Sequence, residues 1–555
     1  MSRSGAVCLW ASTMGCLSLA FLSSGLSCDC VNYIFVGGMD QMLAMADGTR
    51  LATDVYPAAG SGKYPIVLSR TPYDRKEPFN ADRGTSWGGA GVVYMVQDAR
   101  GQFGSEGTAD FFGSDMADGQ HVLGTLAGDC ASNGHIALVG NSAPGIMAYM
   151  AMPNRPSTLD CAWVEVATGN LYKSVFSGGV FRSHLVQEWL SGTNQTHMLA
   201  EIVAHPLDDT WWDARQVIEQ VDWWFPSTVH LTGWFDIFTL GQIEMFQAMQ
   251  AGTATTPAEA TPSRQHLIIG PWSHNTLGAA TTGQLTFPNG ALDIGTMQED
   301  WLAYYLLGTA NDVPNWPAVQ YFAMGDVDAA GAPGNEWRQA TTWPPFTAAN
   351  QTLYLRAGGA LNETAPGAAE GFDQYTYDPT NPVPTTGGNN MLLADGPYDQ
   401  VAAVESRPDV VTYTTAALTA PLEVTGTVHA SMWIQADVTD TDISVRLSDV
   451  YPDGRSMLIT EEILRTRFRS GSFTSETLMT PGTAYLIEFD LWPTSIVFNT
   501  GHRIRVAVTS SNSPRFDANP NTGDAFRANS NTQIATVKIL HEAAHPSSVV
   551  LPTAP

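Results

Sequence analysis

The sequence is poor in basic residues. Its 26 lysines and arginines stand against 54 aspartates and glutamates, which gives a formal net charge of −28 over 555 residues. A field of that sign repels phosphate backbones and anionic lipid surfaces. Nucleic-acid binding and attachment to anionic membranes are therefore excluded as main functions, whereas a soluble protein with a small-molecule substrate remains open.

Metal-binding patterns and long apolar runs are also missing. The sequence has only 6 cysteines, and none of them stands at the spacing from histidines that zinc sites use. We therefore predict no metal site. Beyond the N-terminal segment, no apolar run has the length needed to cross a bilayer. No internal repeat is present.

The N-terminal segment 1–27 has the features of a secretory signal peptide. Arg3 gives a positive start, an apolar stretch follows, and a small-x-small cleavage site precedes Cys28. A buried N-terminal helix is the alternative. The site also resembles that of a lipoprotein, although Gly25 stands where lipoproteins carry a bulky aliphatic residue. We expect a secreted or periplasmic protein, with lipid anchoring at Cys28 as the minor alternative.

Removal of the signal peptide would leave Cys28, Cys30, Cys130 and Cys161. Cys130 precedes one apolar run and Cys161 begins another. If the two runs are neighbouring strands, a Cys130–Cys161 disulfide is geometrically possible in an oxidising compartment. We carry this pairing as a hypothesis.

The chain is too long for one core, so about two or three domains are expected. Segments 31–168 and 226–349 alternate apolar strand-like runs with helical stretches such as 115–126, and Asp47-Gly48 has the composition of a hairpin turn. Alternation of this kind predicts an α/β sheet domain of hydrolase type.

The stretch HIALVGNSAPGIMAYMAM, residues 135–152, holds the first chemical signal. An apolar β run passes through Gly140-Asn-Ser142-Ala-Pro-Gly145 into a buried helix. A serine between glycines at a strand-to-helix junction predicts a nucleophile elbow, because the sharp turn needs small neighbours and exposes the serine oxygen. The spacing is G-x-S-x-x-G rather than G-x-S-x-G, so an ordinary glycine-rich turn is the alternative.

Asp236 and His274 strengthen this reading. Each directly follows an apolar strand-like run, as Ser142 does, so all three are expected at one edge of the sheet. The chain order Ser142, Asp236, His274 is the order that α/β-hydrolases use. We predict a triad in which Ser142 is the nucleophile, His274 the base and Asp236 the acid. A buried core histidine is the alternative for His274. This chemistry needs no cofactor.

Two further segments differ in character. Segment 169–225 mixes aromatic and acidic residues at helical spacing without strand-like runs, which predicts a helical cap inserted into the sheet domain. Segment 350–555 holds short alternating strands, which predicts a C-terminal β-sandwich of jelly-roll type. Within it, the Pro-, Gly- and Thr-rich stretch 364–388 is expected to be a long surface loop.

Several motifs occur in one order along the chain: RTPYD at 70–74, QDARGQFGSEG at 97–107, the serine elbow, GWFDIF at 233–238, GPWSH at 270–274, YDPTNPVPTTGG at 377–388 and DVYPDGRS at 449–456. Together they resemble the cocaine esterase and X-prolyl dipeptidyl peptidase family of S15-type serine hydrolases. The resemblance implies an α/β-hydrolase domain, a helical cap and a C-terminal jelly roll, with the active site where the three meet.

The resemblance also implies roles beyond the triad. The oxyanion donors fall on the Tyr73 hydroxyl and the backbone N–H of Ala143, where the family usually has tyrosine. This departure leaves substrate specificity open. Phe238 falls on an aromatic position of the acyl pocket, and Trp234 and Trp189 are further pocket candidates. A turn tyrosine that only packs is the alternative for Tyr73.

The leading hypothesis is a secreted serine hydrolase that cleaves carboxylic esters, with amides as a second substrate class, through an acyl-enzyme. The alternative is a dipeptidyl aminopeptidase of X-Pro type, whose acidic groups would capture a free amine; Asp208, Asp209 and Glu188 are candidates. A remote alternative is an inactive secreted binding protein whose jelly roll holds a sugar. The expected partner is a small ester or short peptide, and the oligomeric state stays open.

Overall fold

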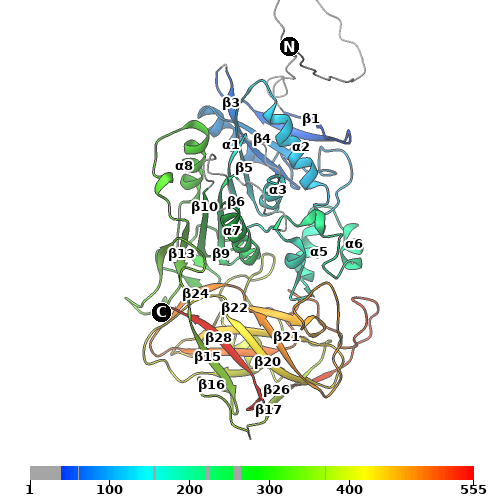
Figure 1. Cartoon of the computed structure of the whole chain (residues 1–555), viewed down its shortest axis with the longest axis vertical. Coiled ribbons are helices and arrows are strands. Elements are labelled where there is room, and N and C mark those ends of the chain that lie inside the picture. Colours follow the sequence, from blue (N-terminus) through cyan, green and yellow to red (C-terminus); the bar gives the residue numbers. More distant parts are fainter. Residues whose placement is uncertain (1–38, 61, 154–157, 219–225, 254–263, 369) are drawn as a thin grey trace, which may run out of the picture.

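The computed structural model describes residues 39–60, 62–153, 158–218, 226–253, 264–368 and 370–555. The predicted signal peptide lies outside the described residues. Figure 1 shows an α/β layer in the upper half of the molecule, a β-sandwich below it, and helices α5 and α6 beside the boundary between them. Among the described helices, none combines the length and the apolar character that crossing a membrane requires.

The upper layer is built on a ten-stranded sheet with the order β1-β2-β4-β3-β5-β6-β9-β10-β13-β14. The strands from β4 to β13 run parallel, and the edge strands pair antiparallel. The β1–β2 turn falls at Asp47-Gly48, as predicted, with Gly48 at φ 88°. The strands are β1 (Gln41–Ala44), β2 (Arg50–Tyr56), β3 (Tyr64–Thr71), β4 (Val93–Asp98), β5 (Ser132–Asn141), β6 (Leu159–Glu165), β9 (Ser227–Phe235), β10 (Gln265–Ser273), β13 (Val319–Ala323) and β14 (Glu336–Ala340).

Helices cover both faces of this sheet. α1 (Pro78–Gly89) and α8 (Ile294–Leu307) bury residues such as Trp87 and Trp301 in the core on one face. α2 (Asp115–Ala127), α3 (Ala143–Ala151) and α7 (Thr239–Thr253) contribute to the core on the other face. Because both faces are covered, the strands β3, β4, β9 and β10 are buried along almost their whole length, which is typical of parallel sheets.

The cap between β6 and β9 is mainly helical. It contains α4 (Leu171–Val175), α5 (Ser183–Gly192), α6 (Met198–Ala204) and the short turn η1 (Asp213–Arg215). The sequence predicts no strands in this segment, and that prediction is wrong at one point: β7 (Phe176–Ser177) and β8 (Val180–Phe181) form a small hairpin. Its turn docks on the β-sandwich: the Arg465 N–H donates to the Gly178 carbonyl at 3.0 Å.

The lower half is the β-sandwich. Its strands are β15 (Ala349–Arg356), β16 (Ala360–Asn362), β17 (Phe372–Tyr377), β18 (Val411–Thr414), β19 (Leu422–Gly426), β20 (His429–Ala436), β21 (Asp442–Val450), β22 (Ser456–Arg465), β23 (Ala484–Asp490), β24 (Thr494–Phe498), β25 (Arg503–Thr509), β26 (Ala535–Glu542), β27 (His545–Pro546) and β28 (Ser548–Thr553). The prediction of a surface loop over 364–388 is wrong for part of this stretch. It contains β17, which pairs with β26 and buries Tyr375 and Tyr377. The stretch that follows ends in buried residues, 387–390.

The two halves share one hydrophobic core. Trp234, Phe246 and Phe322 from the α/β layer belong to the same buried cluster as Val424 and Ile496 from the sandwich. The backbone continues this contact, because Met324 forms a parallel bridge with Ile496. The sandwich is therefore packed into the α/β layer rather than tethered beside it.

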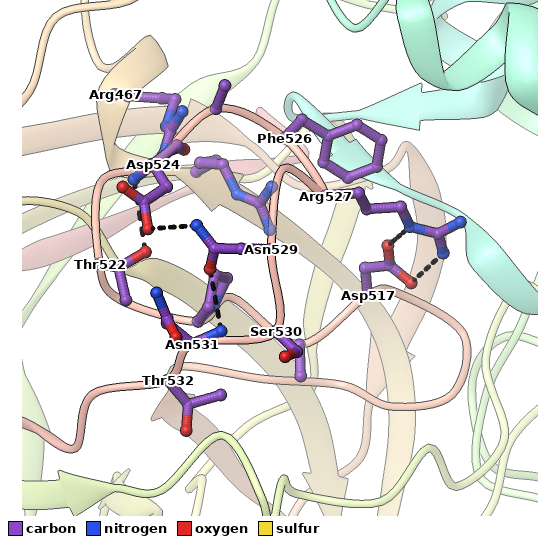
Figure 2. Close-up of a pocket in the computed structure, with 14 residues that line it drawn as sticks. Arg467, Asp517, Thr522, Asp524, Phe526, Arg527, Asn529, Ser530, Asn531 and Thr532 are labelled. Carbon is purple, nitrogen blue, oxygen red and sulfur yellow. Dashed lines mark hydrogen bonds and ion pairs between the residues drawn. The ribbon is translucent and has the colours of Figure 1, made fainter.

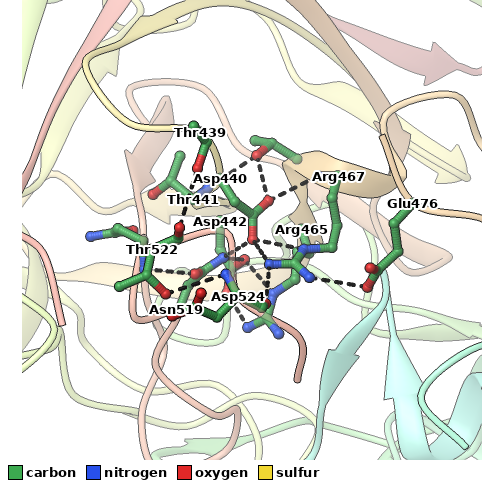
Figure 3. A network of polar contacts seen from close by, with 12 residues as sticks. Thr439, Asp440, Thr441, Asp442, Arg465, Arg467, Glu476, Asn519, Thr522 and Asp524 are labelled. Atoms are coloured by element: carbon green, nitrogen blue, oxygen red, sulfur yellow. Dashed lines mark hydrogen bonds and ion pairs between the residues drawn. The ribbon is translucent and has the colours of Figure 1, made fainter. Parts of the chain in front are cut away.

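A buried ion-pair network closes one end of the sandwich (Figure 3). Arg467 donates to Asp440 at 2.9 Å, and Arg465 donates to Asp442 at 2.9 and 3.0 Å. Asn519 donates to both carboxylates, at 2.9 and 2.7 Å. Since each buried charge has an opposite partner and further hydrogen bonds, the network holds the turn after β22 and the 517–532 loop against β21.

The Cys130–Cys161 disulfide hypothesis is wrong. Cys161 is a buried free thiol, whereas Cys130 is disulfide-bonded. β5 and β6 are indeed neighbours, but their register pairs Cys161 with Ala137. Cys130 lies in the turn that precedes β5, so it does not stand opposite Cys161.

Candidate active site

The turn between β5 and α3 presents Ser142 in a strained conformation. Ser142 has φ 61° and ψ −126°, in a region that non-glycine residues rarely adopt. A Cβ on Gly140 would lie 2.3 Å from the Pro144 carbonyl, and one on Gly145 would lie 2.8 Å from the Ala167 Cβ. The sharp turn therefore requires both glycines, and this is the geometry of a nucleophile elbow.

Ser142, His274 and Asp236 form one chain of hydrogen bonds. The His274 Nε2 lies 3.0 Å from the Ser142 Oγ, and its Nδ1 lies 2.5 Å from the Asp236 Oδ2. Asp236 follows β9 and His274 follows the adjacent parallel strand β10. The sequence-predicted trio thus meets at one sheet edge, and His274 is held by two reactive partners rather than by core packing alone.

The Asp236 carboxylate is fully buried and oriented by its own turn. Its Oδ1 accepts the Phe238 N–H at 2.7 Å and the Thr232 hydroxyl at 3.4 Å. Its Oδ2 is thereby left for His274. A carboxylate fixed in this way selects one tautomer and one ring orientation of the imidazole.

Tyr73 lies in the turn after β3, with its hydroxyl at the site. The Trp189 Nε1–H donates to the Tyr73 oxygen at 3.0 Å. Desolvation raises the pKa of the Tyr73 hydroxyl, and hydrogen bonds with Trp189 and Ser142 offset part of that rise. Because the oxygen accepts from Trp189, the single hydroxyl hydrogen is available to donate to a bound ligand.

Two motifs outside the site hold this turn. The buried Arg75 guanidinium pairs with Asp98 at 2.5 Å and with Asp54 at 3.1 Å, and the Arg75 N–H also donates to Asp98 at 2.8 Å. Asp98 belongs to the QDARGQ motif, while Arg75 directly follows RTPYD. The Arg75–Asp98 pair therefore links the two motifs: Asp98 of QDARGQ fixes the backbone at Arg75, directly after RTPYD.

Ala143 is the first residue of α3 and is 2% exposed. The first N–H groups of a helix have no partner within it, so they are suited to bind a developing negative charge. The methyl side chain leaves more room at the cleft than the tyrosine that the resemblance leads one to expect.

An apolar cleft of about 470 Å³ opens at Ser142 and Ala143. None of the described residues that line it carries a carboxylate. Phe238 and Trp189 lie in its wall, as predicted, and Phe238 packs edge-on against His274 at 5.9 Å between ring centroids. The remaining lining residues are Phe111, Phe112, Ile146, Leu171, Ser174, Val175, Leu185, Val186, Ile237 and Met391.

Trp234 is not part of this cleft. It is 2% exposed, donates its Nε1–H to the Phe322 carbonyl at 2.7 Å and packs on Trp343 in the shared core. The prediction that it lines the pocket is wrong, because its side chain packs into the core that the α/β layer shares with the sandwich.

Phe111 and Phe112 were missed by sequence reasoning. Both have positive φ angles, 51° and 66°, and both pack on Trp189 with ring centroids 5.8 and 5.3 Å apart. Strained residues of this kind concentrate at functional sites. The only sequence signal is an adjacent pair of phenylalanines just before a helix.

The three acidic candidates for amine capture lie elsewhere. Asp208 accepts from Gln216 at 2.6 Å, Asp209 pairs with His205 at 2.9 Å, and Glu188 is exposed on α5. None of them lines the apolar cleft.

A second cavity, of about 600 Å³, lies in the sandwich beneath the 517–532 loop (Figure 2). Its walls are polar: Arg527 pairs with Asp517 at 2.7 Å, and Asn529 donates to Asp524 at 3.0 Å. The described residues that line it include no histidine that would activate a nucleophile. Within the described residues, no group of histidine, cysteine or acidic side chains is arranged to hold a metal ion.

The sheet order, the elbow and the hydrogen-bonded trio define an α/β-hydrolase with an appended β-sandwich. The model of the X-Pro dipeptidyl-peptidase (S15 family) matches residues 47–198 and 190–276, and that of the X-Pro dipeptidyl-peptidase C-terminal non-catalytic domain matches 311–550. The chain is 30% identical over 580 residues to cocaine esterase of Rhodococcus sp. (strain MB1 Bresler), covering 92% of this chain and 97% of that protein. It belongs to the cocaine esterase (CocE/NonD, S15-type) family of serine hydrolases, which confirms the resemblance.

Solved structures support the same fold. An aminopeptidase from the marine sediment archaeon Thaumarchaeota archaeon aligns with a TM-score of 0.78 at 24% identity, over 93% of this chain and 96% of that one. An α-amino acid ester hydrolase also gives 0.78, at 23% identity over 96% and 100% of the two chains. The predicted fold class, an α/β-hydrolase with a helical cap and a C-terminal jelly roll, is confirmed.

Proposed function

We propose that this protein hydrolyses carboxylic esters with an apolar acyl group, with amides as a second substrate class, through an acyl-enzyme on Ser142. One observation carries the proposal: the Ser142–His274–Asp236 chain lies at the mouth of a cleft that is lined, among the described residues, by apolar side chains and serine and by no carboxylate. An uncharged acyl group gains free energy from such a cleft, at about 25 cal/mol per Å² of apolar surface buried.

In the acylation step, the Ser142 Oγ attacks the ester carbonyl while the His274 Nε2 takes its proton. Asp236 stabilises the imidazolium that forms. His274 then donates the proton to the leaving alkoxide as the carbon–oxygen bond breaks. In the second step, water gives a proton to His274 and attacks the acyl carbon. The bond from that carbon to the Ser142 Oγ then breaks, His274 returns the proton to Oγ, and the acid is released.

Two donors would stabilise the charge on the carbonyl oxygen. The Tyr73 hydroxyl keeps its hydrogen at neutral pH because desolvation raises its pKa, and Trp189 fixes the direction of the oxygen. The Ala143 N–H at the start of α3 is the second donor. Donors held in place before the reaction contribute more than donors that must reorient.

The same observation disfavours the alternative function, a dipeptidyl aminopeptidase of X-Pro type. A protonated amine that entered the apolar cleft would lose its hydration, and none of the described lining residues offers a carboxylate in return. Burying an unpaired charge in this way costs on the order of several kcal/mol. Asp208 and Asp209 are engaged with Gln216 and His205, and Glu188 is exposed on α5, so none of these candidates is placed to capture an amine in the cleft.

The test compares aromatic and short acyl esters with Gly-Pro and Ala-Pro arylamides, together with labelling by a fluorophosphonate. We expect ester turnover, little arylamide cleavage and rapid labelling. Ser142→Ala should abolish both turnover and labelling, whereas Ser174→Ala, a serine of the same cleft whose hydroxyl donates to the Asn170 carbonyl, should retain both. Preferred arylamide cleavage would reverse the assignment, and an unlabelled wild type would support the inactive binding protein.

We further propose that the protein is secreted or periplasmic. The signal-like segment 1–27 supports this, and so does the disulfide at Cys130, since disulfides persist in oxidising compartments. N-terminal sequencing of exported protein should give a start near Cys28. A start at a lipid-modified Cys28 would favour the lipoprotein alternative, and an intact Met1 would contradict export.

A further inference from the structure

We propose that Asn389, a residue of the C-terminal jelly roll, positions the catalytic acid Asp236 from across the domain boundary. The inference rests on the proposed function and extends it to a part of the chain that the matching family model describes as a non-catalytic domain. Asn389 belongs to the loop 387–395, between β17 and the single turn η4 (Val401–Glu405). We call this segment the 387–395 loop.

The contacts of Asn389 are directed at the backbone that carries the acid. Its Nδ2 donates to the Trp234 carbonyl at 3.0 Å and to the Asp236 carbonyl at 2.8 Å. Both hydrogens of the amide are used in this way. Asn389 is 2% exposed, so no water competes for these two carbonyls on its side.

The cap holds the same turn from a second direction. The buried Arg182 guanidinium donates to the Ile237 carbonyl at 3.0 Å and to the Asn389 carbonyl at 3.3 Å. Burial is the main cause that lowers the pKa of Arg182 to about 9, and the charge of Asp236 opposes the lowering. Cap and jelly roll therefore meet at the backbone of residues 234–238.

The 387–395 loop is rigid enough for this task. Gly388 and Gly396 exchange backbone hydrogen bonds of 2.8 and 3.0 Å, which closes the loop. Asn390 donates to the Gly387 carbonyl at 2.6 Å and to the Ala394 carbonyl at 3.2 Å. The loop is thus braced from within, without any contribution from Asp236.

The loop also reaches the base and the cleft. Asn275, the residue after His274, donates to the Met391 carbonyl and to Asp395, both at 2.8 Å. The Met391 side chain lines the apolar cleft. One loop of the jelly roll therefore contacts the turn of the acid, the neighbour of the base and the wall of the acyl pocket.

Removing the Asn389 amide leaves two buried carbonyls without a donor and frees the turn that aims Asp236 at His274. The cleft walls remain, so substrate binding should change little while the chemical step slows. Loss of groups that orient a reactive side chain typically costs about 10–100-fold in activity at metal sites, and we expect a similar fall in kcat here.

The experiment compares Asn389→Ala with Asn390→Ala, which weakens the same loop without touching the acid. For Asn389→Ala we expect kcat to fall about 10–100-fold, KM to stay within about threefold, and fluorophosphonate labelling to slow in parallel with kcat. The acid side of its kcat/KM profile should move to lower pH, because a displaced carboxylate stabilises the protonated imidazole less. Asn390→Ala should lower the melting temperature with near-normal kcat and an unchanged profile.

Two results would overturn the inference: normal kcat and profile in Asn389→Ala, or equal losses in both variants in proportion to their melting temperatures. If Asn389→Ala does not fold, Asn389→Leu takes its place, since leucine is close to asparagine in size and removes both donors without adding a charge beside Asp236. The labelling rate needs only an activated Ser142 and no ester. A wild type that is labelled but cleaves no ester would therefore contradict the proposed substrate while still testing Asn389.

Discussion

At the scale of single residues, the active site combines two kinds of group. Ser142 is a nucleophile in a strained backbone conformation, and Tyr73 and the Ala143 N–H are donors that act when negative charge develops on the carbonyl oxygen. Tyr73→Phe removes one such donor and keeps the ring. We expect kcat to fall by about 10²–10³, with a smaller change in KM and continued slow labelling of Ser142. Steady-state kinetics and thermal melting check this, and a kcat within about threefold of wild type would remove Tyr73 from the mechanism.

Trp189→Phe is the companion variant. It keeps an aromatic wall but removes the hydrogen bond that aims the Tyr73 oxygen. A net hydrogen bond is worth about 0.5–1.5 kcal/mol, so its effect on kcat should be clearly smaller than that of Tyr73→Phe.

The residues that the sequence made predictable are those placed by strand ends. Ser142, Asp236 and His274 each follow a strand, and parallel strands bring their ends together whatever the loops do. Asn389 could not be found in this way, since its partners lie 155 and 153 positions away and no local pattern encodes that contact.

At the scale of elements, the buried network of Figure 3 predicts a stability effect far from the cleft. Arg467→Met would leave Asp440 buried without its cation. Breaking a buried pair on one side typically costs about 3–5 kcal/mol, and we expect a loss of that size in the free energy of unfolding by urea.

The matched control is Arg50→Met, which breaks an exposed pair with Glu106. An exposed pair contributes about 0–1 kcal/mol, so this variant should unfold almost like the wild type. Equal losses in the free energy of unfolding for the two variants would mean that the buried Arg467–Asp440 pair contributes no more to stability than the exposed Arg50–Glu106 pair.

Register and pairing set the limits of prediction for elements. The neighbouring strands of Cys130 and Cys161 were foreseen, but the offset between them depends on the β5–β6 register. The Pro- and Gly-rich flanks of β17 predict a loop, whereas the pairing of β17 with β26 decides its conformation. The alternation of strands and helices is a local property of the sequence, so the fold class can be predicted even where the register or the pairing of single strands cannot.

At the scale of the whole molecule, the shared core predicts that the α/β layer is not stable alone. Ending the chain at residue 349 would remove the sandwich side of the buried cluster to which Trp234, Phe246 and Phe322 belong. We expect an aggregated or inactive product, checked by size-exclusion chromatography and ester turnover. A monodisperse, fully active fragment would show that the sandwich is an accessory.

A buried histidine between the halves predicts a pH effect on stability. His502 lies 2.9 Å from Asp449 in the sandwich and 3.1 Å from Asp326 after β13. Burial disfavours its charged form, but the two aspartates outweigh burial and raise the pKa of His502 above the usual 6.5.

A raised folded pKa means that the folded protein binds the proton more tightly than the unfolded chain. The stabilisation is therefore complete below about pH 6.5 and is lost as the pH rises through the raised value. We expect the melting temperature to decline on the alkaline side, and His502→Gln to lack that component. Identical pH profiles for the two proteins would contradict this linkage.

The position of the 387–395 loop has a consequence for how such proteins can diverge. Genes that encode separate domains are readily recombined, but here a loop encoded in the C-terminal half completes the setting of the acid in the N-terminal half. A hybrid that joins this α/β layer to the sandwich of a relative would inherit mismatched partners for Asp236 and Asn275. The two halves are therefore expected to change together along a lineage, and a functional crossover point would need to fall after the loop rather than at the domain boundary.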